Sequence, residues 1–361
     1  MKKNQKTNGM NVFDEYKRLG EPDKKEKSEI WQTAIGLQQV DGLTPSQYLI
    51  ETAKQNIEGK ITIYEVKERL NDYYKAKPIK KDTDRTEEAD KVSAHITEIL
   101  SEKTFTFSPA EYITIHKRLF AGIYKHAGKI RDYNISKAEW VLNGETVYYA
   151  SSGSIMATLD YDFEQEKKFS YKGLSKEQIA EHVAGFVSSL WQIHAFGEGN
   201  TRTTAVFIIK YLRTFGFTIT NDLFAENSWY FRNALVRANY NDYKNNIYST
   251  MEFLNRFFDN LLLDGKNVLK NRELLVKVGG EGDTVNDTVS MQYDTVNDTV
   301  FLLIKKMPKI TSTKIAENLG VGVATVKREI KRLKDNGCIE RVGSDKTGYW
   351  RVIKDDGEKM K

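Results

Sequence analysis

A nine-residue stretch, His194-Ala195-Phe196-Gly197-Glu198-Gly199-Asn200-Thr201-Arg202, brings together the residue types best suited to chemistry. An imidazole with an ordinary pKa of ~6.5 can take a proton from a hydroxyl group near neutral pH. Glu198 offers a hard oxygen ligand of the kind that Mg²⁺ accepts beside nucleotide phosphates. A lone histidine in a loop is most often structural, but this combination favours proton transfer next to a bound anion, with His194 as the base.

The second half of the stretch predicts an anion site. Gly199, Asn200 and Thr201 precede an apolar helix, and the free N–H groups at a helix start attract phosphate. Arg202 adds a planar guanidinium that matches phosphate oxygens. The nine residues therefore combine a base, a metal ligand and a phosphate cradle.

Two buried helices are expected to hold this loop. Ser175 and Gln178 form a capping box that opens a helix with an apolar face. After the loop, residues 203–215 form a strongly apolar helix that Gly216 closes. A loop fixed between two buried helices can hold reactive groups in place.

At these residues the sequence resembles the Fic family, whose signature is His-x-Phe-x-Asp/Glu-Gly-Asn-Gly-Arg-x-x-Arg. The resemblance extends over residues 85–275 and includes 119–124 and the Gly-x-x-Arg segment 128–131. It implies a mainly α fold, a helical Fic bundle, and an enzyme that transfers AMP from ATP to a hydroxyl of Ser, Thr or Tyr in a target protein or in itself.

The resemblance also implies a role for each residue of the loop. His194 would be the catalytic base, Phe196 a packing anchor and Glu198 the ligand of Mg²⁺. The expected nucleotide-binding residues are Gly197, Gly199, Asn200, Thr201 and Arg202.

Three positions depart from the family pattern. Ala195 stands where proline is common, Thr201 where glycine is usual, and Ala205 where the second arginine is expected. In the family that arginine steadies the terminal phosphates of ATP. Its absence leaves open phosphoryl transfer, as in the related Doc toxins, beside AMP transfer.

Three helices are expected before residue 80, and they resemble an antitoxin-type inhibitory module. Some Fic proteins carry a helix with Ser/Thr-x-x-x-Glu-Gly whose glutamate engages the second arginine. Here residues 37–42 read Leu-Gln-Gln-Val-Asp-Gly, so Asp41 is the inhibitory candidate, paired with Arg202 or blocking the pocket. A plain helix end at Asp41 is the alternative, and Glu58-Gly59 is a weaker second candidate.

A β-hairpin is expected on the helical body. Two β-prone arms flank an Asn-Gly turn, a strong hairpin signal. The resemblance makes it a target-binding flap that would hold the target as an added strand. The residues assigned to the flap are Trp140, Val141, Leu142, Asn143 and Gly144.

The last 55 or so residues resemble a winged helix-turn-helix domain. Two short helices start near Ser312 and Val323, and two β-prone segments follow around residues 338–342 and 349–353. The second helix of such domains enters the DNA major groove. The predicted DNA contacts are Thr325, Lys327, Arg328, Lys331 and Arg332, and the alternative is a winged helix that docks on protein.

Charge supports this reading, because residues 301–361 hold 15 Lys and Arg against 8 Asp and Glu. The 361 residues suffice for several domains. We expect an N-terminal module at 1–80, a Fic domain at 85–275, a linker at 276–299 with a duplicated Asp-Thr-Val-Asn-Asp-Thr-Val, and the winged helix at 300–356.

The composition of the chain limits where the protein can be located. One cysteine, Cys338, excludes an internal disulfide, and no apolar run is long enough to cross a membrane. No secretory signal is recognisable, so we expect a cytoplasmic protein without a membrane partner; a homodimer stays open.

A rival function belongs to another class. The chain could be a transcriptional regulator whose Fic-like body has become a nucleotide sensor, which the changes at Ala195 and Ala205 favour. The enzyme hypothesis requires the His194 imidazole to face a cavity that admits a nucleotide, and the regulator hypothesis does not.

Overall fold

The computed structural model describes residues 22–76, 85–217, 222–276, 300–301, 303–305, 307–319, 323–335, 337–343 and 348–353. These residues are mainly helical, and their strands form one two-stranded sheet near the C-terminal end, so the mainly α class predicted from the sequence is confirmed. The duplicated heptapeptides of the expected linker lie outside the described residues.

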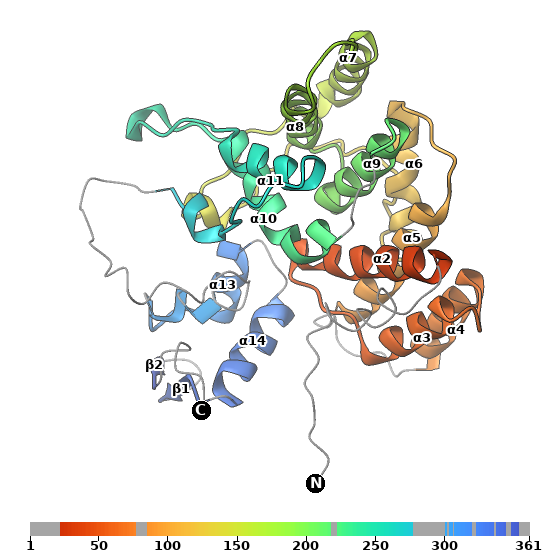
Figure 1. Ribbon diagram of the computed structural model, residues 1–361. Helices are drawn as coiled ribbons and strands as arrows, with labels where there is room; N and C mark the ends of the chain where they lie inside the picture. The colour runs from red at the N-terminus through yellow and green to blue at the C-terminus, as the bar shows by residue number, and fades with distance from the viewer. Residues whose placement is uncertain are drawn as a thin grey trace.

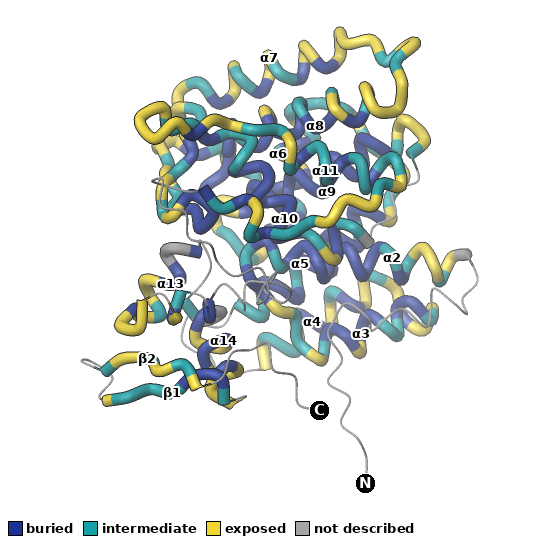
Figure 2. Tube along the Cα trace, turned by 60° about the vertical axis from the view of Figure 1, so that its left-hand side comes forward, coloured by how far each residue is buried: buried dark blue, intermediate teal, exposed yellow. Residues whose placement is uncertain are grey.

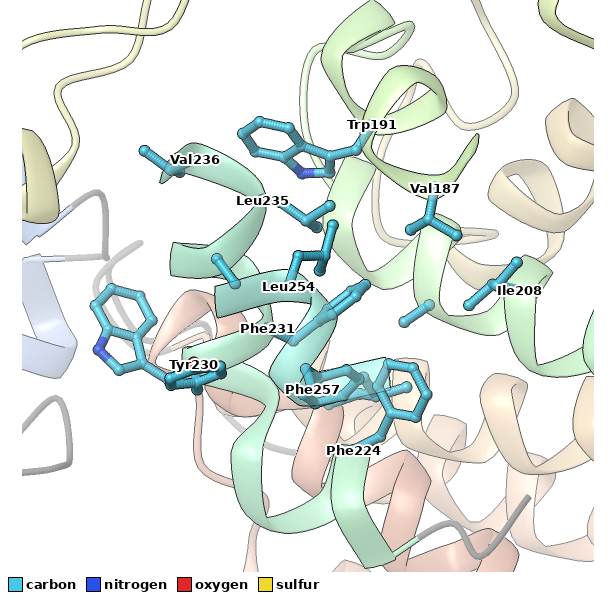
Figure 3. Close-up of a cluster of buried hydrophobic side chains, with 14 of the residues drawn as sticks. Val187, Trp191, Ile208, Phe224, Tyr230, Phe231, Leu235, Val236, Leu254 and Phe257 are labelled. Carbon is cyan, nitrogen blue, oxygen red and sulfur yellow. The ribbon is translucent and has the colours of Figure 1, made fainter. Parts of the chain in front are cut away.

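Four helices surround the centre of the molecule. They are α8 (Lys176–Ile193), α9 (Asn200–Thr214), α10 (Asp222–Ala238) and α11 (Glu252–Leu262). Figure 3 shows how their apolar side chains meet, with the Phe231 ring of α10 tilted against the Phe257 ring of α11 at 5.0 Å between ring centres. Every described side chain of α9 from residue 200 to residue 212 is buried. The signature loop therefore opens onto the most deeply buried helix of the chain.

Three further helices lie around this centre: α5 (Thr86–Ser101), α6 (Pro109–Leu119) and α7 (Ile155–Lys168). Ser108 caps α6, with its hydroxyl accepting from the backbone of Glu111 at 3.1 Å. The sequence-predicted capping box at Ser175 and Gln178 is confirmed at the start of α8. Buried residues gather at α9 and α10, while α7 carries many exposed residues at the rim (Figure 2).

The N-terminal part forms α2 (Pro22–Gly36), the 3₁₀ helix η2 (Leu37–Asp41), α3 (Gln47–Ile57) and α4 (Ile63–Ala76). Helix α2 crosses beside α5 and α10 (Figure 1). Its Ile30 and Ala34 enter the main core, while Trp31 and Ile35 join a second core with α3 and α4. Helix α2 thus belongs to both cores, and the η2 turn that follows it packs against α10 and α9.

The expected β-hairpin at residues 140–149 is wrong. Residues 140–142 form a 3₁₀ turn, η3 (Trp140–Leu142), and no strand is assigned between residues 139 and 150. The three apolar side chains are buried, and the backbone closes on Glu139, whose carbonyl accepts from Leu142 and Gly144 at 3.0 Å. All three side chains are buried in the main core. Residues 140–142 therefore cannot form a β-strand of a hairpin, in which side chains alternate between two faces.

Short 3₁₀ turns complete the body, namely η4 (Ser152–Ser154), η5 (Tyr243–Asn245) and η6 (Asn271–Leu274). Of the helices that the structure describes, none combines the length and apolarity needed to span a bilayer.

The C-terminal part has the predicted winged-helix order: α13 (Ser312–Leu319), α14 (Val323–Asp335), β1 (Ile339–Val342) and β2 (Tyr349–Val352). The strands are antiparallel, with Ile339 opposite Val352. Val326, Ile330 and Leu333 of α14 are buried. Figure 1 places this part beside α10, at the lower left.

Candidate active site

The signature loop connects the end of α8 to the start of α9. His194 ends α8 in the left-handed conformation, at φ 49° and ψ 54°, which is uncommon for a residue with a side chain. Gly199 begins α9 at φ 77°, and a Cβ there would lie 2.3 Å from the Phe120 ring. The loop is therefore a tight turn in which glycine is required at position 199.

The Asn200 side chain locks the loop. Its amide nitrogen donates to the carbonyl of Phe196 at 2.7 Å, and its carbonyl oxygen accepts from the backbone N–H of Phe196 at 2.9 Å. Asn200 was predicted to contact phosphate, but its amide group is already used within the loop. Asn200 holds in place the backbone N–H groups at the start of α9. That these N–H groups bind phosphate stays a prediction.

His116 positions the loop from α6. Its ring stacks on Phe196 at 3.7 Å, and its Nε2 bonds the carbonyl of Glu198 at 3.0 Å. The backbone N–H of Gly128 donates to Nδ1 at 2.8 Å, so Nε2 carries the proton. Burial lowers the pKa of His116 to about 4. The sequence could not predict the link between His116 and the loop, because the two are far apart in the chain.

The His194 imidazole is buried, with 4 % of the residue exposed. Tyr149 covers it, the two ring centres lying 4.1 Å apart, and Trp191 meets it edge-on. Neither ring nitrogen has a hydrogen-bond partner. Burial, together with the nearby charges of Lys137 and Arg232, holds the pKa of His194 well below its usual value. The ring is thus neutral and unpaired, and it is covered rather than open to a cavity.

Arg131 holds the backbone of His194. Its Nε donates to the His194 carbonyl at 2.7 Å, and its own N–H donates to the carbonyl of Ala195 at 3.0 Å. The same guanidinium also bonds Tyr133 and Ala150, which ties the segment over the imidazole to the end of α8. A cation at a helix C-terminus satisfies carbonyls that have no partner within the helix.

Thr201, which stands in place of the usual glycine, faces inward. Its hydroxyl accepts from the Trp191 indole N–H at 3.0 Å. The hydroxyl therefore fastens α9 to α8. Ala205, one turn further along α9, is fully buried.

Arg202 is the most heavily paired residue of the site and is fully buried. Its Nη2 lies 2.8 Å from Asp41 Oδ2 and 2.7 Å from Glu88 Oε1, and its Nη1 donates to Gln38 at 3.0 Å. The Phe120 ring lies under the guanidinium at 4.8 Å. The predicted pairing of Asp41 with Arg202 is confirmed as a contact. This contact occupies the guanidinium that was expected to bind phosphate.

Burial alone would raise the pKa of Asp41, but Arg202 and Arg85 outweigh it and lower the pKa. The carboxylate is therefore charged. Gly42 ends the η2 turn at φ 64°, so the predicted helix end at Asp41-Gly42 is also confirmed. The alternative candidate, Glu58, lies at the end of α3 and pairs with Lys60 at 2.5 Å.

Glu198 faces solvent, with half of its side chain exposed, and its Oε2 lies 3.4 Å from Lys137 Nζ. Within the described residues no group of three or more His, Cys, Asp and Glu side chains could hold a metal ion. Mg²⁺ commonly uses one or two carboxylates and takes its other ligands from phosphates and water. The exposed Glu198 carboxylate beside the predicted phosphate site fits this type of Mg²⁺ coordination.

A buried ion pair lies behind Tyr149. The Glu139 carboxylate is 2.8 Å from Arg232 Nη2, and Tyr149 donates to it at 3.4 Å. Arg232 also reaches the carbonyl of Leu319 at 3.5 Å, at the end of α13. Burial raises the pKa of Glu139 even though Arg232 opposes the rise. This pair connects the segment over His194 to the winged-helix part.

The basic face of α14 is exposed at four of the predicted DNA contacts, Lys327, Arg328, Lys331 and Arg332. Thr325 lies in α14, but its side chain is outside those that the structure describes. Arg328 also approaches the carbonyl of Gly42 at 3.5 Å.

Several residues around the loop escaped the sequence analysis because their partners are remote in sequence. Arg85 and Glu88 are three residues apart at the start of a helix, a spacing at which an ion pair is expected. No sequence signal could have placed them beside Arg202. His126 also lies near the loop, with its Nε2 3.7 Å from the Cβ position of Gly197.

Comparison with known families assigns two parts of the chain. Residues 106–212 match the Fic/DOC family, and residues 295–349 match a helix-turn-helix (HTH) domain. The chain therefore includes a segment, residues 106–212, that is similar to Fic domains. It is similar to protein adenylyltransferase VbhT of Bartonella schoenbuchensis, with 30 % identity over 108 residues that make up 30 % of this chain. The chain spans about a fifth, 21 %, of that relative's length.

The comparison with solved structures finds Fic proteins at low TM-scores. A Fic family protein from Desulfovibrio desulfuricans G20 has a TM-score of 0.42 at 12 % identity, with 99 % of this chain and 98 % of that one covered. The N-terminal Fic domain of Bep8, an effector of Bartonella sp. 1-1C, has a TM-score of 0.34 at 17 % identity and covers 55 % of this chain and 82 % of its own.

Proposed function

We propose that the Fic domain transfers AMP from ATP to a Ser, Thr or Tyr hydroxyl of a protein, and that the structure describes its resting state. The buried, unpaired imidazole of His194 carries the proposal. A buried polar group without a partner costs about 1–3 kcal/mol, and such groups are tolerated mainly where a function needs them. A neutral imidazole is also the form that accepts a proton.

The proposed chemistry assigns each step to a residue of the loop. His194 takes the proton of the target hydroxyl, and the oxygen attacks the α-phosphorus of ATP. The bond from that phosphorus to the bridging oxygen breaks, and pyrophosphate leaves. The N–H groups at the start of α9, from Gly197 to Thr201, and the Arg202 guanidinium hold the phosphate oxygens.

Glu198 is the residue that would hold Mg²⁺, released from its exposed contact with Lys137. When bound, the ion neutralises phosphate charge. Glu198 lies two residues before the first residue of α9, so the ion and the cradle would share the same phosphates.

The resting state needs two changes before ATP can enter. Asp41 must leave Arg202, which is why we propose Asp41 as the inhibitory residue. Tyr149 must also move off His194. The enzyme hypothesis requires the His194 imidazole to face an open cavity, and the covered imidazole does not meet this requirement. A resting state with Tyr149 over the imidazole would explain why the site is closed.

Target binding is proposed for the segment over the site. Trp140, Val141 and Leu142 are buried and would support the segment, while Asn143 is exposed and Gly144 partly so. Beyond them Tyr148 is 81 % exposed. A target could pair with this outer arm, residues 145–150, as an added strand.

Ala205 leaves a second outcome for the same site, in which the γ-phosphate is transferred. ATP labelled at the α- or the γ-phosphate separates the two reactions. We expect α-label on this chain or on a partner protein, and none after His194→Ala. Transfer of γ-label alone would select phosphoryl transfer, and equal labelling by the His194→Ala variant would overturn both.

A second candidate function is a nucleotide-sensing transcriptional regulator. The covered His194 and the exposed basic face of α14 favour it. It predicts salt-sensitive DNA binding that ATP modulates and that survives His194→Ala. Lys331→Ala should weaken DNA binding and lower the salt slope by about 1, while Lys176→Ala, on the exposed start of α8, should change neither. Both proposed functions include DNA binding by the C-terminal part and a cytoplasmic location. A homodimer stays a prediction.

A further inference from the structure

We infer that Arg85 supplies the second guanidinium of the phosphate site, the one that Ala205 cannot supply. The inference rests on the proposed function for its ligand. It assigns a binding residue from outside the signature loop.

Two guanidinium groups converge at this site. Arg85 Nη2 lies 2.6 Å and Arg202 Nη2 lies 2.7 Å from one oxygen, Glu88 Oε1. The Tyr124 hydroxyl donates to the same oxygen at 2.6 Å. Two like charges are held together in a buried place only when an anion lies between them. The pair is therefore a preformed anion clamp that Glu88 aligns.

Asp41 is the anion in this cluster that can be replaced. Its only ion pair among the described residues is with Arg202, and it lies in a short 3₁₀ turn. Its side chain is 19 % exposed, against 8 % for Glu88, which lies on the long helix α5. Arg85, Arg232 and Lys137 act on the same carboxylate beside Arg202. Positive charge from four side chains thus lowers the pKa of Asp41.

The clamp also keeps unused binding capacity. Arg202 Nε is buried without a hydrogen-bond partner. Arg85 is 30 % exposed at its side chain, so it can meet a ligand that arrives from solvent. With Asp41 gone, two arginines and one carboxylate remain, and the net positive charge favours a polyphosphate.

Calorimetric binding of ATP, AMP and tripolyphosphate tests the inference without requiring activity. We expect Asp41→Asn to bind ATP at least tenfold more tightly than the native chain. Adding Arg85→Ala should lose at least tenfold of that affinity, while AMP, which lacks the terminal phosphates, should change less than twofold. Tripolyphosphate should compete with ATP in Asp41→Asn only while Arg85 is present.

The matched control is Arg118→Ala in the same Asp41→Asn chain. Arg118 also pairs with a carboxylate, Glu102, but at the opposite end of α5. It should leave ATP affinity unchanged. If Arg85→Ala lowers the melting temperature, Arg85→Lys carries the test, because lysine keeps the charge and loses the planar fork. Partial loss of ATP affinity is then expected.

The outcomes separate the two proposals. Unchanged ATP affinity after Arg85→Ala or Arg85→Lys overturns the clamp, even if label transfer is observed. Arg85-dependent ATP binding without any label transfer contradicts the transferase and leaves the clamp standing.

Discussion

The Asp41 carboxylate lies 2.8 Å from the Arg202 guanidinium, joining the turn after α2 to the first turn of α9. Glu88 from α5 shares the same guanidinium, so three remote segments close one anion site. The N-terminal part is thereby coupled directly to the signature loop.

Asp41→Asn should therefore activate the protein. The amide keeps the shape of the side chain but not the charge that opposes phosphate, and label transfer from ATP should rise at least tenfold. Asp72→Asn, which changes an exposed carboxylate on α4, is the control and should leave transfer at its native level. Equal transfer by all three proteins would contradict an inhibitory role for Asp41.

Gly199 and Gly216 offer a matched test of the loop geometry. Both have positive φ, 77° and 78°, but a Cβ meets Phe120 at 2.3 Å only at position 199. Gly216→Ala should cost about 1 kcal/mol of unfolding free energy from backbone strain alone. Gly199→Ala should cost about 1–3 kcal/mol more, because of overpacking. Chemical denaturation measures both, and equal losses would show that the contact with Phe120 is not limiting.

The pH dependence of stability should report His116. Burial lowers its folded-state pKa from 6.5 to about 4, so the unfolded chain binds a proton as pH falls below ~6.5 and the folded chain does not. Its share of stability is fully present above pH ~6.5 and is lost toward pH ~4, by about 2 kcal/mol at pH 5.

Denaturation at pH 7.5 and pH 5 checks this expectation. His116→Gln should be less stable than the native chain at pH 7.5, because its ring contacts are lost, and should show a shallower decline with acid. A decline as steep as in the native chain would assign the pH dependence to other groups.

Tyr149 should control access to His194. Tyr149→Ala removes the ring that covers the imidazole, and carbethoxylation of His194, followed by mass spectrometry, should become at least tenfold faster. Tyr149→Phe keeps the cover and should not change the rate. Tyr148→Ala, at an exposed neighbour, is the second control. No acceleration in Tyr149→Ala would mean that other side chains close the site.

Local signals in the sequence were enough for the helices that frame the loop. The Ser175–Gln178 capping box and the helix end at Asp41-Gly42 depend on neighbours a few residues away, and both were predicted correctly. The family resemblance of residues 194–202 also needed no structure, because the signature is contiguous.

Tertiary structure decided what surrounds those residues. The β-prone arms at 140–149 gave way to a 3₁₀ turn because the core buries residues 140–142. Glu88 reaches Arg202, and so brings Arg85 close to the site, only because α5 packs beside α2 and α9. The cover over His194 likewise comes from Tyr149, on a separate segment. Sequence alone determined which groups could do the chemistry, whereas long-range packing decided that they are paired and closed, since burial and charge partners depend on residues far apart in the chain.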